Sequence, residues 1–213
     1  MARRKSNRIL PLVLVLIAIA IAIAVLISLA RAVFLPSENN DNQSTGQTQT
    51  QALDPTAALI DTSADRSVSL VASGPIVANE NFRSYQILVS PSSRKLILYE
   101  GYLGRVVDSI DLDNNVNAYT QFVNALNLAG LTAAKIPDDL KDNRQGVCAT
   151  GEYYQFDLNK NYDKDLVARY WTSTCSGSTG TLKADAKQII DLFVVQIPDA
   201  RTILKDINVY STN

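Results

Sequence analysis

The sequence predicts an α+β domain that one N-terminal transmembrane helix and a flexible tether hold outside a membrane. Three observations lead to this prediction: an uncharged apolar run near the N-terminus, a polar stretch after it, and alternating apolar segments mixed with two amphipathic helices. Strands joined by short connections pair as antiparallel neighbours, and amphipathic helices bury their apolar sides on such a sheet. We therefore expect a small antiparallel sheet with two amphipathic helices on one face and one disulfide.

The predicted anchor is the run from Ile9 to Ala30, in which Asp, Glu, Lys and Arg are all absent. A helix rises ~1.5 Å per residue, so this run matches the ~30 Å hydrocarbon core of a bilayer. Four basic residues lie within residues 1–8, and only Arg31 follows the run closely. The positive-inside rule therefore places residues 1–8 in the cytoplasm and the C-terminal domain outside.

A cleaved signal peptide is the rival interpretation of this run, because Ala30-Arg31-Ala32 has the small-x-small form of a cleavage site. The apolar part of a signal peptide is usually ~7–15 residues long, and this run is longer. We therefore expect an uncleaved signal anchor that crosses the lipid bilayer once.

Residues 36–65 are rich in Asn, Gln, Ser and Thr and contain no aromatic side chain. Such a segment cannot bury enough apolar surface to offset its chain entropy. We expect it to be a flexible extracytoplasmic tether, followed by the α+β domain over residues 83–213. The alternation of Val68, Leu70 and Ala72 with polar neighbours indicates one earlier short strand, which sets the start of the fold between Arg66 and Arg83.

The composition argues against several classes of function. Five of the 20 basic residues lie in the first 35 positions, so the rest of the chain has 15 basic against 21 acidic residues, a net charge of about −6. This charge argues against a nucleic-acid partner. There is no His, which removes the commonest general base and the commonest metal ligand. We expect no cofactor and no catalytic constellation.

The domain is expected to start with three strands, over Tyr85–Val89, Leu96–Tyr99 and Arg105–Leu112. A helix follows, with Asn114 and Asn115 as candidate caps at its start and Gly130 near its end. Four apolar residues at helical spacing predict its buried side: Tyr119, Phe122, Val123 and Leu126.

A hairpin is predicted next, with strands over Glu152–Leu158 and Leu166–Thr174. If it is symmetric about Tyr162, three pairs share one core face: Leu158 with Leu166, Phe156 with Ala168, and Tyr154 with Tyr170. The same register brings Cys148 close to Cys175. An even number of cysteines outside the membrane predicts a disulfide, worth on the order of 3 kcal/mol.

The second amphipathic helix is predicted from Leu182 to Gln196, with Thr181 as its N-cap. Pro198 ends it, and a last short helix is expected over Asp199–Asp206.

Two segments place oxygen-bearing side chains at alternate positions, as the start of a calcium loop does: Asp111 to Asn115, and Asp157 to Asp163. Both lack the Gly at position six and the Glu at position twelve of an EF-hand loop, having Val116 or Tyr162 at the sixth position. We therefore predict no metal site.

The second face of the predicted hairpin carries the candidate ligand-binding residues Tyr153, Arg169 and Trp171, with Gln155 beside them. Flat aromatic rings next to hydrogen-bonding groups suit sugars and peptides. The alternative is that another element covers this face and that the rings belong to the core.

The function that we expect is a single-pass, membrane-anchored extracytoplasmic binding module without catalysis, with a protein or glycan ligand outside the membrane. One alternative is a cell-surface hydrolase that uses carboxylates, which would need two acids at a fixed separation across a cleft. The other is a structural subunit of an envelope complex. Four acids near the hairpin could serve the hydrolase: Glu152, Asp157, Asp163 and Asp165.

Overall fold

The computed structural model describes residues 54–134, 144–177 and 180–206. The chain divides into two units, Met1–Thr50 and Gln51–Asn213, and the described residues all belong to the second. The predicted anchor at Ile9 to Ala30 and most of the predicted tether therefore lie outside the described residues. Within the described ranges, no helix has the length and apolar character needed to cross a bilayer.

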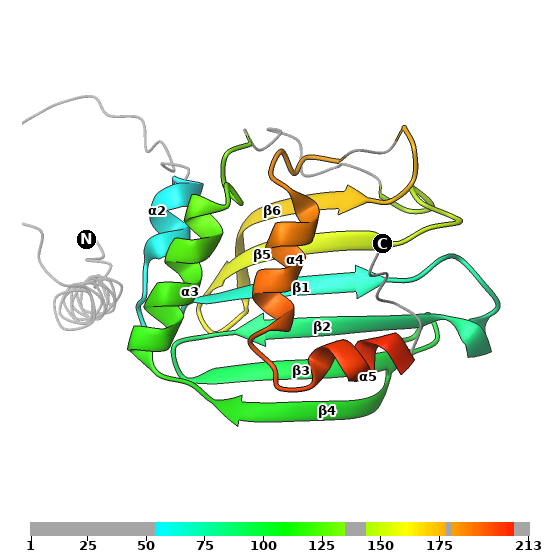
Figure 1. Cartoon of the computed structure of the whole chain (residues 1–213), viewed down its shortest axis with the longest axis horizontal. Coiled ribbons are helices and arrows are strands. Elements are labelled where there is room, and N and C mark those ends of the chain that lie inside the picture. Colours follow the sequence, from blue (N-terminus) through cyan, green and yellow to red (C-terminus); the bar gives the residue numbers. More distant parts are fainter. Residues whose placement is uncertain (1–53, 135–143, 178–179, 207–213) are drawn as a thin grey trace, which may run out of the picture. The chain divides into compact units, whose positions relative to one another are not determined.

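The centre of the fold is one six-stranded sheet with the order β4-β3-β2-β1-β5-β6, in which every neighbouring pair is antiparallel (Figure 1). This confirms the predicted small antiparallel sheet. The strands are β1 (Ser67–Ser73), β2 (Arg83–Val89), β3 (Ser93–Glu100), β4 (Arg105–Asp113), β5 (Tyr153–Lys160) and β6 (Asp165–Ser173).

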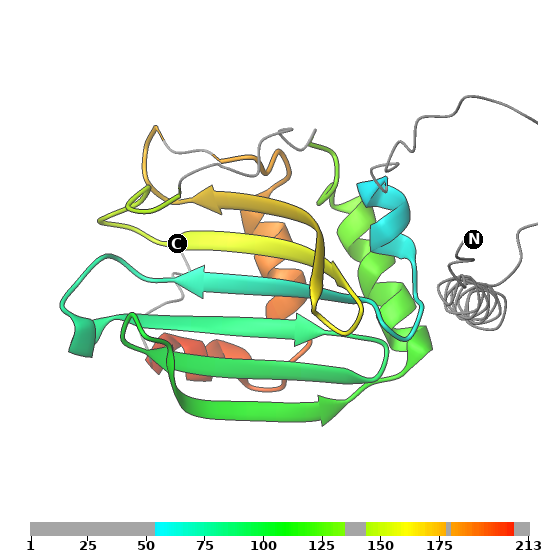
Figure 2. The same ribbon diagram turned by 180° about the vertical axis from the view of Figure 1, so that it is seen from behind.

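All the described α-helices lie on one face of the sheet, and the view from behind shows the strands uncovered (Figures 1 and 2). The predicted placement of both amphipathic helices on one face is confirmed, since α3 and α4 cross the same side. The helices are α2 (Pro55–Ile60), α3 (Val116–Leu128), α4 (Ala186–Val194) and α5 (Ala200–Asp206), and a short 3-10 helix, η1 (Asn79–Asn81), lies in the β1–β2 connection.

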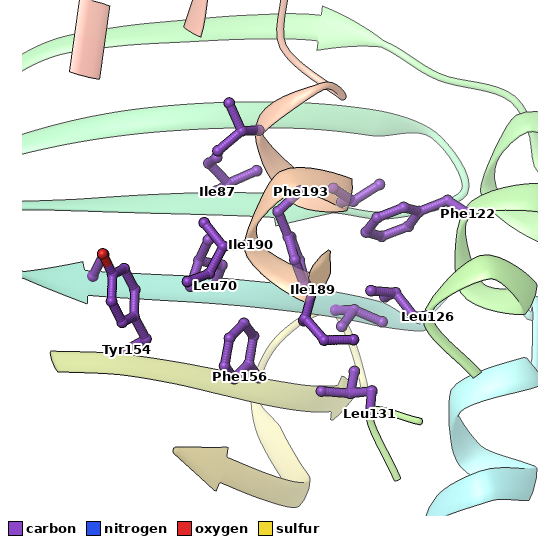
Figure 3. Close-up of a cluster of buried hydrophobic side chains, with 14 of the residues drawn as sticks. Leu70, Ile87, Phe122, Leu126, Leu131, Tyr154, Phe156, Ile189, Ile190 and Phe193 are labelled. Carbon is purple, nitrogen blue, oxygen red and sulfur yellow. The ribbon is translucent and has the colours of Figure 1, made fainter. Parts of the chain in front are cut away.

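The core fills the space between the helices and the sheet (Figure 3). Phe193 of α4 lies at its centre, where its ring meets Phe122 of α3 edge-on at 5.1 Å and Phe156 of β5 at 6.0 Å. The alternating apolar residues of β1 and β2, such as Leu70 and Ile87, are fully buried beneath them. The period-two pattern in the sequence therefore marks the helix-facing side of the strands.

The fold begins earlier than the sequence predicts. Helix α2 falls within the range expected to be tether, yet its Leu59 is fully buried and it packs on α3. Asp54 caps the helix by accepting a hydrogen bond from the Thr56 amide at 3.1 Å. Six residues are too few for the apolar positions of α2 to show helical spacing in the sequence. The surface that buries α2 comes from α3, which is distant in sequence. The early strand around Leu70 is confirmed as β1, between β2 and β5.

Helix α3 agrees with its prediction, whereas α4 begins later than expected. Asn115 caps α3 by accepting from the Ala118 amide at 2.9 Å. Helix α4 begins at Ala186, and its N-cap is Asp185 rather than Thr181. Thr181 is instead hydrogen-bonded to the edge strand β6. The Thr181 hydroxyl accepts from the Trp171 amide, and the Thr181 amide donates to the Trp171 carbonyl.

The β5–β6 hairpin exists, but its predicted register is wrong by two residues. Leu158 pairs with Ala168 rather than with Leu166. The turn is centred one half-residue later than assumed, with Lys160 opposite Asp165, and a β-bulge then adds one residue to β6. As a result Leu166 is 38 % exposed and does not belong to the core. Five of the six predicted core residues are buried: Tyr154, Phe156, Leu158, Ala168 and Tyr170.

The predicted disulfide between Cys148 and Cys175 is present, with Cα atoms 5.5 Å apart. It ties the loop before β5 to the segment after β6, and therefore closes the hairpin at the end opposite its turn. Gly151 packs so closely on this bridge that an added Cβ would lie 2.9 Å from the Cys148 sulfur.

Candidate functional site

The sheet face opposite the helices carries a mixture of polar and apolar side chains, and no described helix covers it (Figure 2). Strand alternation places on it the odd-numbered residues of β1, β3 and β5 and the even-numbered residues of β2. Most of these residues are half-buried. The half-buried residues near the middle of the face are mainly uncharged: Val71, Ser73, Ser84, Gln86, Leu88, Ile97, Tyr99 and Gln155. Such a face is solvated but not strongly charged, which suits contact with a polar, uncharged ligand.

The predicted residues Tyr153, Arg169 and Trp171 come together on this face, on β5 and β6. The rings of Tyr153 and Trp171 lie 5.8 Å apart at 31°. Arg169 forms a two-pronged ion pair with Asp157, from Nε to Oδ1 at 2.6 Å and from Nη2 to Oδ2 at 2.7 Å. These hydrogen bonds raise the pKa of Arg169, and the pairing commits its charge to Asp157.

Gln155 joins the ion pair to Tyr153. Its Nε2 donates to Asp157 Oδ2 at 2.8 Å, and its Oε1 accepts from the Tyr153 hydroxyl at 3.2 Å. Arg144, from the loop before β5, donates to the same Oε1 at 3.1 Å and to the Tyr153 hydroxyl at 3.3 Å. Burial raises the pKa of Tyr153, and the charge of Arg144 opposes that rise. Arg144 was not predicted, because the signal for it lies only in the folded loop.

Trp171 is less accessible than its two neighbours, with 9 % of its surface exposed. The chain after β6 folds back on it, and an added Cβ at Gly180 would lie 2.9 Å from the indole ring. Tyr153 and Arg169 remain partly exposed, so these two side chains can still reach a ligand. Direct contact of all three with a ligand stays a prediction.

A hollow of about 230 Å³ lies beside the β5–β6 hairpin loop. Figure 2 shows this loop, the approach to β1 and the β2–β3 turn at the same end of the sheet. Its walls come from the approach to β1, the β2–β3 turn and the hairpin loop. Its lining is mostly polar: Ala64, Asp65, Arg66, Ser67, Leu88, Ser90, Ser92, Ser93, Lys95, Tyr162 and Asp163. Five hydroxyls and two carboxylates in so small a space provide many hydrogen-bonding groups for a ligand.

The hairpin loop at this hollow has an unusual backbone. Asn161, Tyr162 and Asp163 have successive φ angles of 53°, 56° and 69°, a conformation that residues other than Gly rarely adopt. The approach to β1 holds the loop, because the Asp65 carbonyl accepts from the Tyr162 amide at 3.1 Å and Ser67 donates to Asp163. Tyr162 is consequently fixed at the rim with 71 % of its surface exposed. Strained backbone that the surroundings enforce is common at functional sites.

The carboxylates near the hairpin are not arranged as a metal site. In the described ranges, no group of three or more acidic or cysteine side chains is placed to hold a metal ion. The acidic residues that line the hollow are Asp65 and Asp163, and both already accept hydrogen bonds.

No protein-family model matches the sequence, and no curated protein is significantly similar to it.

Proposed function

We propose that the chain is a single-pass membrane protein whose extracytoplasmic domain is a non-catalytic binding module for a neutral glycan. The observation that carries the proposal is the hollow beside Tyr162, whose lining includes strand residues such as Ser67, Leu88 and Lys95 that alternate onto the face without helices. Its size suits one sugar ring rather than a folded partner. The anchor that would hold the domain at the cell surface is the predicted helix from Ile9 to Ala30.

The lining of the hollow has two basic and two acidic residues, whose formal charges cancel, and this favours a neutral ligand that donates hydrogen bonds. Arg66 and Lys95 are each paired with a carboxylate outside the hollow, Asp61 and Asp111, both at 2.8 Å. The charges not paired in this way belong to the two carboxylates, Asp65 and Asp163. Carboxylates accept hydrogen bonds from sugar hydroxyls, and an exposed Tyr ring offers a flat surface to the C–H side of a sugar.

The same geometry bears on the hydrolase alternative. Asp157 is ion-paired with Arg169, and the two acids that line the hollow itself are Asp65 and Asp163. Both carboxylates are already held by hydrogen bonds within the protein, Asp65 from the Asn161 amide and Asp163 from the Ser67 hydroxyl, whereas a hydrolase needs two acids free to face the scissile bond. This favours binding over hydrolysis.

The test uses the full chain in lipid nanodiscs and three neutral probes: chitotriose, cellotriose and maltotriose. Saturation-transfer NMR measures contact of each sugar with the protein. At least one probe should bind, and Tyr162→Asn should weaken it about tenfold or more, which corresponds to ~1.4 kcal/mol. Asn tolerates the left-handed backbone at this position, so the variant removes the ring without adding strain. Asp163→Asn should also weaken binding.

Leu128→Asn is the matched control, because Leu128 is 88 % exposed at the end of α3 and is not among the residues that line the hollow. It should bind the probe as the native chain does. Binding by none of the three sugars, or equal binding by all variants, would overturn the proposal. Release of shortened sugars that stops in Asp163→Asn would favour the hydrolase alternative instead.

A further inference from the structure

Two uncharged loops meet at the end of the sheet opposite the hollow. They are the start of the β1–β2 connection, residues 74–78, and the β3–β4 turn, residues 101–104 (Figures 1 and 2). Together they expose four apolar side chains, which we call the apolar tip: Ile76 at 51 %, Val77 at 39 %, Tyr102 at 50 % and Leu103 at 98 %. An exposed patch of this kind generally marks an interaction surface.

The apolar tip is a built feature of the fold. The Tyr102 hydroxyl donates to the Val77 carbonyl at 2.7 Å and accepts from the Val77 amide at 3.1 Å. The Tyr102 amide donates to Asn79 Oδ1 at 3.0 Å, and the Phe82 ring stacks on Tyr102 at 4.1 Å. The two loops are therefore fixed to each other, and Leu103 projects from them without contributing to the core.

The charged residues behind the apolar tip compensate one another. Glu100 pairs with both Arg83 and Arg105, and the exposed Glu80 of η1 supplies the second acidic residue. No residue in 74–78 or 101–104 is charged. A strongly charged partner has no complementary charge at the tip itself. The surroundings that suit such a tip are apolar with a polar boundary, which is the chemistry of a lipid interface.

Two features favour a lipid surface over a protein as the partner of the apolar tip: the small area of the tip and the covalent link from the domain to the predicted anchor. A stable protein interface needs ~800 Å² and about 20–30 residues per side, far more than four side chains supply. A lipid contact can be weak if the domain is already held beside the bilayer, because tethering raises its effective concentration. The 23 residues between Ala30 and Asp54 span at most about 80 Å when extended, enough to let either end of the sheet reach the surface.

From these observations we infer that the apolar tip inserts into the lipid interface of the membrane that holds the anchor. This inference rests on the membrane topology in the proposed function, but not on its glycan ligand. Insertion of the tip would turn the opposite end of the sheet, with the hollow, away from the bilayer. Because the tip is neutral, binding should depend little on salt or on anionic lipid.

The test places a Trp at the tip in the full chain, reconstituted in liposomes. Leu103→Trp should keep the native fold, since Leu103 is almost wholly exposed. Its emission should shift to the blue and lose intensity with brominated phosphatidylcholine, to the same extent at low and high salt. Leu128→Trp, an equally exposed position at the other end of the sheet, should show neither effect. The native chain gives the background of Trp171, which is buried.

The possible outcomes separate a failure of the apolar-tip inference from a failure of the membrane topology. Equal emission from Leu103→Trp and Leu128→Trp would overturn the inference. A blue shift without quenching by the brominated lipid would show contact between copies of the chain and would also overturn it. Alkaline carbonate extraction of the same liposomes tests the anchor separately. A chain that stays in the membrane but shows no quenching at residue 103 contradicts the apolar tip alone, whereas a chain that washes out contradicts the topology itself.

Discussion

At the scale of single residues, Trp171 lies on the sheet face without helices and is nevertheless buried against Tyr153 and Gly180. Truncation of a buried aromatic residue leaves a cavity and typically costs ~3–5 kcal/mol. We therefore expect Trp171→Ala to lower the free energy of unfolding by about 3 kcal/mol, measured by denaturant titration followed by circular dichroism. Tyr162→Asn should change it little. A loss below about 1 kcal/mol for Trp171→Ala would show that the ring is not part of a packed cluster.

Gly180 is required for a steric reason that can be separated from its backbone angle. Its φ is +70°, and an added Cβ would lie 2.1 Å from the Trp171 carbonyl oxygen. Gly177 has a φ of +86° with nothing within 4 Å of an added Cβ. Gly177→Ala should therefore lose only the ~1 kcal/mol of the left-handed conformation, and Gly180→Ala should lose clearly more. Equal losses in thermal unfolding would show that the close approach to Trp171 can relax.

At the scale of elements, the sequence predicts which helices and strands exist better than it predicts where each of them begins and ends. The strands and α3 are recognised because their apolar residues recur with the period of a strand or helix. The start of α4 is missed because both Thr181 and Asp185 are suitable N-cap residues, and Thr181 is instead hydrogen-bonded to β6. The hairpin register is missed because nothing local in Leu166 and Val167 shows the bulge. Both errors come from contacts with other segments, which a single sequence does not display.

The connection from α2 to β1 predicts a pH dependence. Hydrogen bonds from the Ser63 side chain and backbone, with help from Arg66, lower the pKa of Asp61 below its usual value near 4. A carboxyl with a lowered folded pKa stabilises the fold above its unfolded pKa, and this stabilisation is lost as pH falls through the folded pKa. Unfolding free energy should therefore fall, as pH decreases through and below about 4, more steeply in the native chain than in Asp61→Asn. Parallel curves would contradict this role of Asp61.

At the scale of the whole molecule, the predicted site and the hollow differ in how far they could be foreseen. Tyr153, Arg169 and Trp171 follow from strand alternation within one hairpin, so the sequence brings them to one face even with a wrong register. The hollow is built from the approach to β1, the β2–β3 turn and the hairpin loop, which are separated by up to about 100 residues. Only the sheet order brings these segments together, and that order is a property of the whole fold.

The topology of the whole chain is the last prediction. The basic residues before Ile9 indicate that the N-terminus is cytoplasmic and that everything after the anchor is outside. Trypsin is a poor probe of this arrangement, because no Lys or Arg lies between Arg31 and Arg66, and Arg66 is ion-paired with Asp61.

A protease of broad specificity can instead cut within the polar stretch of residues 36–53. Added to sealed cells that produce the chain with a tag at each end, it should separate the C-terminal tag from the membrane fraction and leave the N-terminal tag intact. Lysis before digestion should expose the N-terminal tag as well, which controls for access. A cleaved signal peptide would leave no N-terminal tag on the mature chain before any digestion. Protection of the C-terminal tag in intact cells would reverse the topology and place the sheet, its hollow and the apolar tip on the cytoplasmic side.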